Sequence, residues 1–189
     1  MDVNVFRQII LVNELGGDER LAFRFSDPDG VRTRKSGYSF GVCQFDINNN
    51  PEAILCLRQC GFTTDEIATL KAQTMHVGKL EAKLAAHADI VARWDHRQLV
   101  ECLEYPLSLC DKSGILLAGR ETLYHLADYH NQFYMSRGGK MHKYLMSCGR
   151  PVDPTDVLHL KLSTAWGRKR PDDVHRRYNN ISRIVGDAA

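Results

Sequence analysis

The chain has 189 residues with 25 basic and 23 acidic side chains, so its formal net charge is only +2. This length suits one compact domain with a sizeable apolar core, and we expect a monomer. The weak basic surplus argues against nucleic acid as a partner, because dedicated nucleic-acid binders usually carry a stronger, clustered excess. No apolar run approaches the length that membrane insertion requires. A mildly basic protein remains suited to an anionic polymer.

The six cysteines form neither a CxxC pair nor a dense framework. We expect reduced, buried thiols in a protein made in a reducing cytoplasm. Cys56 and Cys60 lie four residues apart in a predicted helix, a separation that fits a disulfide poorly. Residues 1–7 lack a basic segment followed by an apolar one, so no cleavable secretion signal is expected. An activity outside the cytoplasm would then need release or delivery by another factor.

The first predicted element is a helix, because apolar residues recur at helical spacing over Val5–Leu15. Gly16-Gly17 ends this helix. Residues 18–50 have a different pattern. Asp27-Pro28-Asp29-Gly30 is a strong turn signal, and the run from Ser36 to Phe45 alternates small, aromatic and aliphatic residues as a short pair of strands does.

The rest of the chain is predicted to be helical. Asn50 is a predicted N-cap with Pro51 in the first helical position, and Gly61 ends that helix. Thr63, followed by acidic residues, opens the next one. The basic cluster Arg168-Lys169-Arg170 is expected in a solvated loop between the last two helices. Further helical periodicity covers residues 79–93, 96–110, 119–134, 139–147, 154–165 and 171–184.

These patterns predict an α+β fold that is mainly α, a helical bundle with a small β-hairpin lobe. We expect a single domain over residues 1–189. Within it, residues 18–50 would form one wall of a cleft and residues 51–189 the helical lobe.

Glu14 is the first candidate for chemistry because it lies at the end of the first apolar helix. Loss of solvation favours the neutral form of a carboxyl, and helix C-terminal carbonyls disfavour a negative charge. A protonated acid facing a cleft can donate its proton to a glycosidic oxygen. An ordinary exposed glutamate is the alternative. Asp27, Asp29 and Asp46 follow as possible second carboxylates, although turn capping would also account for Asp27 and Asp29.

The run Ser39-Phe40-Gly41-Val42-Cys43-Gln44-Phe45-Asp46 resembles the Gly-aliphatic-aliphatic-Gln motif of goose-type lysozymes and lytic transglycosylases. In that family the motif follows a catalytic glutamate at a helix end, and Glu14 precedes the motif here in the same order. The resemblance covers about residues 14–46 and implies a lysozyme-like fold with Glu14 as general acid. The intervening loop is longer than in most transglycosylases, and its spacing differs from the Glu-Asp-Thr pattern of phage T4-type lysozymes.

The resemblance also implies the residues that contact substrate. Gln44 and the backbone of Gly41 would line the groove that holds the sugar chain, because a missing side chain lets a glycan approach the strand. Tyr38 and Ser39 would contribute beside them. Asp46, with either Asp27 or Asp29, matches acidic positions that place water in some members of the family.

A second, shorter resemblance lies near residue 129. Ala127-Asp128-Tyr129-His130-Asn131 is similar to the Tyr-Asn motif of lytic transglycosylases, in which a tyrosine hydroxyl contacts the catalytic glutamate. Tyr129 and Asn131 are the corresponding candidates, with His130 inserted between them. A partly buried segment of an amphipathic helix is the alternative.

Together these residues imply an enzyme that cleaves the β-1,4 bond between N-acetylmuramic acid and N-acetylglucosamine of bacterial peptidoglycan. The reaction would be either hydrolysis or closure of a 1,6-anhydro ring. Without a secretion signal, the setting resembles that of a phage endolysin, which is freed by a holin and acts on the wall outside the cytoplasm. A secreted antibacterial effector is a second setting.

Two other functions stay open. Chitosanases also place a glutamate at the end of the first helix ahead of a Gly-Tyr-rich strand, as Gly37-Tyr38 would be, but a mildly basic protein suits cationic chitosan poorly. A non-catalytic helical module would use Arg168–Arg170 and Arg176-Arg177 on a partner or nucleic acid. The sequence has no HExxH pattern, so we expect no metal and no cofactor, and we expect Cys43 to be a small buried residue.

Overall fold

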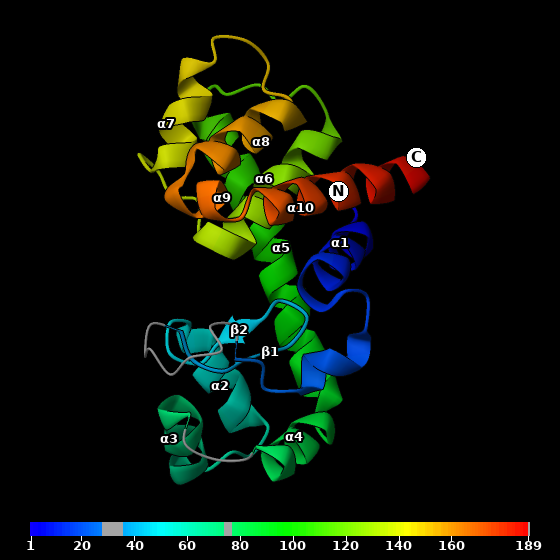
Figure 1. Ribbon diagram of the computed structural model, residues 1–189, viewed down its shortest axis with the longest axis vertical. Helices are drawn as coiled ribbons and strands as arrows, with labels where there is room; N and C mark the ends of the chain where they lie inside the picture. Colours follow the sequence, from blue (N-terminus) through cyan, green and yellow to red (C-terminus); the bar gives the residue numbers. More distant parts are fainter. Residues whose placement is uncertain (28–35, 74–76, 189) are drawn as a thin grey trace. The chain divides into compact units, whose positions relative to one another are not determined.

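The computed structural model (Figure 1) describes residues 1–27, 36–73 and 77–188. Within them lie ten α-helices, one short 3-10 helix and a two-stranded antiparallel sheet. The mainly helical α+β class predicted from the sequence is therefore confirmed. Among these helices, none combines the length and the apolar character that a bilayer-spanning segment needs.

The chain forms two compact units. The hairpin unit is Glu14–Gln98, and the helical unit consists of Met1–Asn13 together with Leu99–Ala189. Helices α1 (Val3–Leu15) and α5 (Ala88–Lys112) contribute residues to both units.

The hairpin unit extends beyond the lobe that the sequence predicted. Helix α2 contacts strand β2, and α4 contacts the 3-10 helix η1. The amide of Phe25 donates a 3.0 Å hydrogen bond to Glu81 Oε1 on α4. This unit continues past the predicted lobe boundary at residue 50, because the helices after the hairpin pack against it. In chain order the unit contains η1 (Glu19–Phe23), β1 (Ser39–Phe40), β2 (Phe45–Asp46), α2 (Pro51–Gln59), α3 (Thr64–Ala72), α4 (Gly78–Ala85) and the start of α5.

The strand pair expected from the alternating residues is present. Strands β1 and β2 pair antiparallel, with Phe40 opposite Phe45. An isolated antiparallel bridge adds Ser26 beside Ser39, with a 2.9 Å hydrogen bond in each direction. The ring of Phe40 lies 5.7 Å from that of Phe45 and 5.9 Å from that of Phe25. These buried aromatic contacts hold the small sheet together.

The predicted starts of α2 and α3 are confirmed. The Asn50 side chain accepts a 2.9 Å hydrogen bond from the amide of Glu52, and Pro51 occupies the first turn. Thr63 and Glu66 form a capping box at the start of α3. Each side chain satisfies a backbone amide that has no partner inside the helix.

One predicted helix boundary is wrong. A break was expected between residues 93 and 96, but α5 continues through this stretch from Ala88. The break lies earlier, where the carbonyl oxygen of His87 accepts hydrogen bonds from the amides of Ile90 and Val91. Residues 88–105 contain neither glycine nor proline, so nothing in the backbone ends the helix there.

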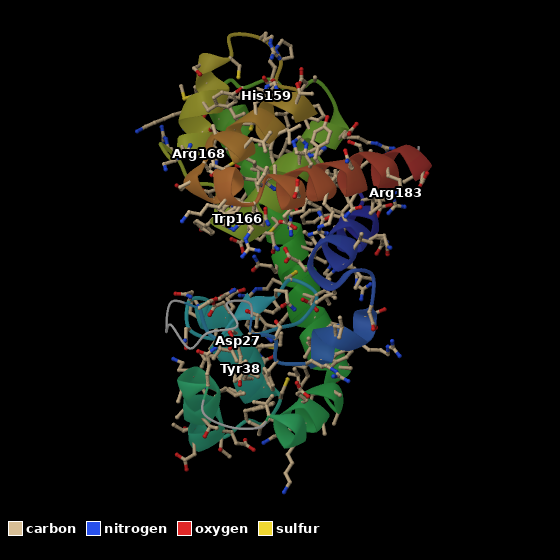
Figure 2. The ribbon with its side chains drawn as sticks, viewed as in Figure 1. Asp27, Tyr38, His159, Trp166, Arg168 and Arg183 are labelled. Atoms are coloured by element: carbon tan, nitrogen blue, oxygen red, sulfur yellow. The ribbon has the colours of Figure 1, made fainter. Side chains whose placement is uncertain are left out.

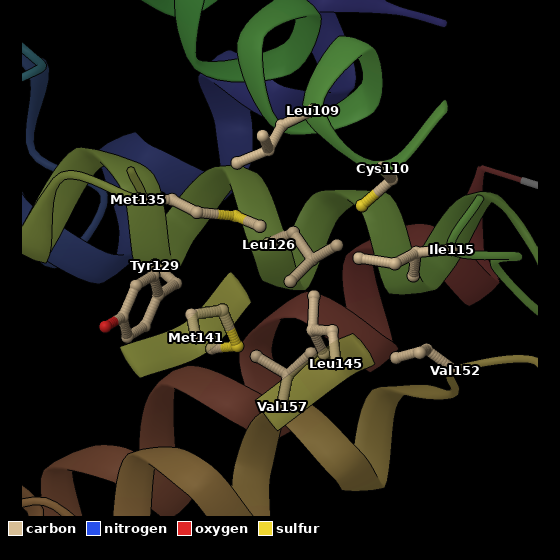
Figure 3. Packing of buried hydrophobic residues seen from close by; sticks show 10 residues of the cluster. All are labelled: Leu109, Cys110, Ile115, Leu126, Tyr129, Met135, Met141, Leu145, Val152 and Val157. Atoms are coloured by element: carbon tan, nitrogen blue, oxygen red, sulfur yellow. The ribbon is translucent and has the colours of Figure 1, made fainter. Parts of the chain in front are cut away.

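The helical unit is built around α6. Every residue from Thr122 to His130 on this helix is buried, and α6 contacts both α8 and α10. In addition to its parts of α1 and α5, the unit contains α6 (Arg120–Phe133), α7 (Lys140–Ser147), α8 (Pro154–Ser163), α9 (Ala165–Lys169) and α10 (Pro171–Asp187). Its apolar core (Figure 3) includes Leu109, Cys110, Ile115, Leu126, Tyr129, Met135, Met141, Leu145, Val152 and Val157.

The basic cluster Arg168–Arg170 does not lie in a loop as expected. Arg168 and Lys169 end helix α9, and Arg170 caps it. Thr164 is the N-cap of this helix, since its Oγ1 accepts a 2.9 Å hydrogen bond from the amide of Gly167. A Cβ on Gly167 would lie 1.9 Å from the carbonyl oxygen of Lys161. Glycine thus allows the extra helical turn to fold back onto the end of α8.

Candidate functional site

Glu14 lies in the last turn of α1 and is half-buried. Its neighbour Leu15 is buried. Gly16 and Gly17 follow with φ angles of 62° and 89°, a left-handed conformation that favours glycine and ends the helix. Glu14 therefore combines partial burial with a surface that solvent or a substrate can reach.

A short connection joins Glu14 to the hairpin within the same unit. Asp18 begins η1, and its Oδ1 accepts a 3.0 Å hydrogen bond from the amide of Arg20. Near the other end of η1, the carbonyl oxygen of the buried Ala22 accepts a 2.7 Å hydrogen bond from the amide of Gly41. The segment that follows Glu14 is thus fixed to the first residue of the hairpin turn.

The Gly-Val-Cys-Gln sequence forms the turn between β1 and β2. Gly41 and Gln44, at its two ends, have φ angles of 77° and 55°. The Gln44 side chain closes the turn: its Nε2 donates to the carbonyl oxygen of Gly41 at 2.9 Å, and its Oε1 accepts from Ser26 Oγ at 2.6 Å. A left-handed backbone costs a non-glycine residue about 1–2 kcal/mol. These side-chain hydrogen bonds help to offset that strain.

Asp95 on α5 is a residue of this site that the sequence analysis missed. Its Oδ2 accepts a 3.0 Å hydrogen bond from the amide of Val42, and its Oδ1 accepts a 2.9 Å bond from the amide of Cys43. Asp95 is only 4% exposed. It lies one helical turn from each of the buried residues Val91 and Leu99. The sequence signal that could have identified Asp95 is thus a carboxylate on the apolar face of a helix, where a buried charge needs a partner.

Asp95 also changes the interpretation of Gly41. The sequence suggested that the missing side chain leaves room for a sugar chain. A Cβ at Gly41 would instead lie 2.9 Å from Asp95 Oδ1 and 3.0 Å from the ring of Phe45. The glycine therefore gives room to these two groups, and a contact between its backbone and a ligand stays a prediction.

Asp46 organises the loop around the hairpin with both carboxylate oxygens. Its Oδ1 accepts from the amides of Gly37, Asn48 and Asn49 at 3.0, 2.8 and 3.1 Å. Its Oδ2 accepts from Ser36 Oγ at 2.6 Å and from Asn49 Nδ2 at 2.8 Å. Burial alone would raise the pKa of Asp46, but these donors outweigh burial and hold the pKa below its usual value. Its role in placing water stays a prediction.

Asp27 differs from Asp46 in its hydrogen bonding. It follows the bridge between Ser26 and Ser39 and is half-buried in the hairpin unit (Figure 2). Its Oδ1 is buried and accepts no hydrogen bond from any part of the chain that the structure describes. An unpaired buried oxygen is costly, so this position would stabilise a water molecule or a ligand hydroxyl. Asp29, the other turn candidate, lies outside the described residues.

Tyr38 and Ser39 differ in how much surface they offer to a ligand. Ser39 is 4% exposed, and its backbone N–H and C=O both bond to Ser26. Tyr38 is half-buried, with its ring 6.1 Å from that of Phe25. The burial of Ser39 does not support its predicted contact with a substrate. Tyr38, labelled in Figure 2, keeps part of its side chain accessible.

Tyr129 and Asn131 belong to the helical unit. Tyr129 is 7% exposed and packs in the apolar core (Figure 3). Its ring lies 5.3 Å from that of Phe133. Burial raises the pKa of Tyr129. Asn131 Oδ1 accepts a weak 3.9 Å hydrogen bond from Cys102 Sγ. The structure gives Tyr129 a packing role, and its predicted contact with Glu14 stays a prediction.

Among the described residues, no group of three or more histidine, cysteine or acidic side chains is arranged to hold a metal ion. In the part of the chain that the structure describes, none of the six cysteines forms a disulfide, and Cys43 is buried. Comparisons with family models, with curated proteins and with solved structures found no match. The functional assignment therefore depends on the residues and geometry of the hairpin unit.

Proposed function

We propose that this chain is a lysozyme-like glycosidase that cleaves the β-1,4 bond between N-acetylmuramic acid and N-acetylglucosamine in peptidoglycan. One observation carries the proposal. A half-buried glutamate at the end of an apolar helix, Glu14, belongs to the same compact unit as the hairpin turn Gly41–Gln44. This combination supports the resemblance to goose-type lysozymes and lytic transglycosylases.

Glu14 acts as the general acid in this proposal. Its carboxyl gives a proton to the glycosidic oxygen as the bond to the leaving sugar breaks. Replacing Glu14 by glutamine preserves the size of the side chain but removes the transferable proton.

Asp27 is the better supported second carboxylate of the two that the structure describes. Five hydrogen bonds occupy the oxygens of Asp46. Asp27 Oδ1, in contrast, is buried without a donor from the described residues. An acceptor of this kind can hold the attacking water, which favours hydrolysis over closure of a 1,6-anhydro ring by Glu14 alone.

Gln44 and Tyr38 are the residues that we expect to contact the glycan. The Gln44 amide uses one N–H and one oxygen lone pair within the hairpin. A primary amide has two of each, so one donor and one acceptor remain for the hydroxyl or N-acetyl groups of a sugar. The partly exposed ring of Tyr38 offers an apolar surface in the same unit.

The setting that we propose is a phage endolysin, made in the cytoplasm and freed by a holin to reach the cell wall. An antibacterial effector delivered by a secretion machine would use the same chemistry. In either setting, the mild positive charge of the chain, +2, would favour its binding to the anionic cell wall.

Digestion of purified sacculi tests the proposal. Wild type, Glu14→Gln and the control Glu104→Gln, which changes an exposed glutamate on α5, are compared by loss of turbidity. We expect Glu14→Gln to lower the rate by about 10²–10⁴-fold and Glu104→Gln to leave it unchanged. If Glu14→Gln digested sacculi at the same rate as wild type, the assignment of Glu14 as the general acid would be wrong.

The products and the polymer separate the remaining alternatives. Fragment masses distinguish hydrolysis from 1,6-anhydro products by one water. If the protein digested soluble chitosan but not sacculi, the substrate would be chitosan and not peptidoglycan.

A further inference from the structure

Four polar side chains from four helices form a buried cluster in the helical unit. Asn13 of α1, Asp128 of α6, Lys161 of α8 and Arg177 of α10 are 4%, 0%, 5% and 2% exposed. Asp128 Oδ1 accepts from Asn13 Nδ2 at 3.1 Å and from Arg177 Nη2 at 2.5 Å. Asp128 Oδ2 accepts from Lys161 Nζ at 2.9 Å and from Arg177 Nε at 3.3 Å.

Asn13 is bound in this cluster through its side chain and its backbone. Besides the bond to Asp128, its Oδ1 accepts a 3.0 Å hydrogen bond from Asn180 Nδ2. Its carbonyl oxygen accepts a 3.1 Å hydrogen bond from Arg176 Nη2. Carbonyl groups in the last turn of a helix have no partner inside the helix. Helix α10 thus supplies donors to the end of α1.

Stability alone does not account for this arrangement. Replacing a buried ion cluster by packed apolar residues is often neutral or stabilising, and asparagine is a poorer helix former than leucine or alanine. Burial would raise the pKa of Asp128, but Arg177 and Lys161 hold that pKa far below its usual value, so the carboxylate stays charged. A buried polar network of this kind can instead select one conformation.

We infer that this cluster is a positioning device for Glu14, with Asn13 as the positioning residue. Asn13 is held at three points: its side-chain NH2 group, its side-chain oxygen and its backbone carbonyl oxygen. The peptide bond between residues 13 and 14 transmits this constraint to Glu14. The backbone from which Glu14 projects is thereby fixed. This role rests on the proposed function, in which Glu14 is the acid and a displacement of about 1 Å costs about 10²-fold in rate.

Asn13→Leu tests this inference because it removes the side-chain hydrogen bonds and leaves Asp128 paired with Lys161 and Arg177. The matched control is Ile181→Val, which disturbs a buried residue of α10 without a bond to Asn13. Initial rates on dye-labelled sacculi give kcat and the apparent KM, and thermal unfolding gives Tm. Amide hydrogen exchange at Glu14, followed by NMR, reports on the end of α1 independently of activity.

We expect Asn13→Leu to lower kcat by about 10–100-fold with an apparent KM within about twofold of wild type. Its Tm should be no lower than that of Ile181→Val, and exchange at Glu14 should be faster than in that control. Equal kcat values in the two variants, or unchanged exchange at Glu14, would overturn the inference. Failure of the wild type to digest sacculi would instead refute the proposed function, and the exchange measurement would still decide the positioning role.

Discussion

Replacing Asp95 by asparagine is expected to destabilise the hairpin unit by about 2–4 kcal/mol. The asparagine keeps one acceptor oxygen, so only one of the amides of Val42 and Cys43 retains its partner. The new NH2 group then faces the other amide, which leaves buried donors unsatisfied. Loss of a hydrogen bond to a charged group costs about 1.5–3 kcal/mol, and an unsatisfied buried donor costs about 1–3 kcal/mol. These two costs overlap, since they concern the same amide.

Urea and thermal unfolding, followed by circular dichroism, measure this loss. For a protein of this size each kcal/mol lowers Tm by about 2–4 °C, so we expect a decrease of about 5–15 °C. The control is Asp89→Asn on the same helix, whose carboxylate pairs with Arg93 at 2.8 Å while both side chains are largely exposed. Such exposed pairs contribute little. If both variants unfold at the same temperature, the Asp95 carboxylate does not hold the turn.

Three further predictions follow from the packing and titration of single residues. Gly41→Ala should destabilise the fold by about 1 kcal/mol more than Gly61→Ala in urea unfolding, because both glycines have φ near 75° but only a Cβ at Gly41 meets other atoms within 4 Å; equal losses would contradict the close approach. Gly167→Ala should displace α9, since its Cβ would lie 1.9 Å from a carbonyl oxygen in the last turn of α8, and an unchanged near-ultraviolet circular dichroism signal from Trp166 would refute this. Burial lowers the pKa of His130 from 6.5 to about 4, so the unfolded chain binds the proton first and stability falls as the pH decreases from about 6.5 towards 4. His130→Phe should therefore lose about 2 kcal/mol less than wild type between pH 7 and pH 5, and equal losses in urea titrations would exclude this origin.

Helix starts with short-range signals were the part of the fold that the sequence predicted best. The cap at Asn50 and the capping box at Thr63 each join a side chain to an amide within three residues. Gly16-Gly17 ends α1 through its own backbone conformation. Such features depend on neighbouring residues alone, so a single sequence contains them completely.

The site residues that the sequence analysis missed depend on long-range contacts. Asp95 reaches the amide of Val42 across 53 residues. Asp128 was read only as part of a motif around Tyr129, whereas it binds side chains from α1, α8 and α10. Periodicity can indicate that a carboxylate lies on a buried helix face. It does not identify the partner, because that partner lies on another element.

The division of the chain into two units has a consequence for folding order. The hairpin unit is one continuous stretch, Glu14–Gln98, whereas the helical unit takes α1 from residues 1–13 and its other helices from residues 99–189. A ribosome makes a chain from its N-terminus towards its C-terminus, so α1 is synthesised before α6 and α10, whose side chains it contacts. The apolar ring of Phe6, which stacks on that of Tyr124 in the folded unit, therefore has no partner on α6 until the whole hairpin unit has been synthesised.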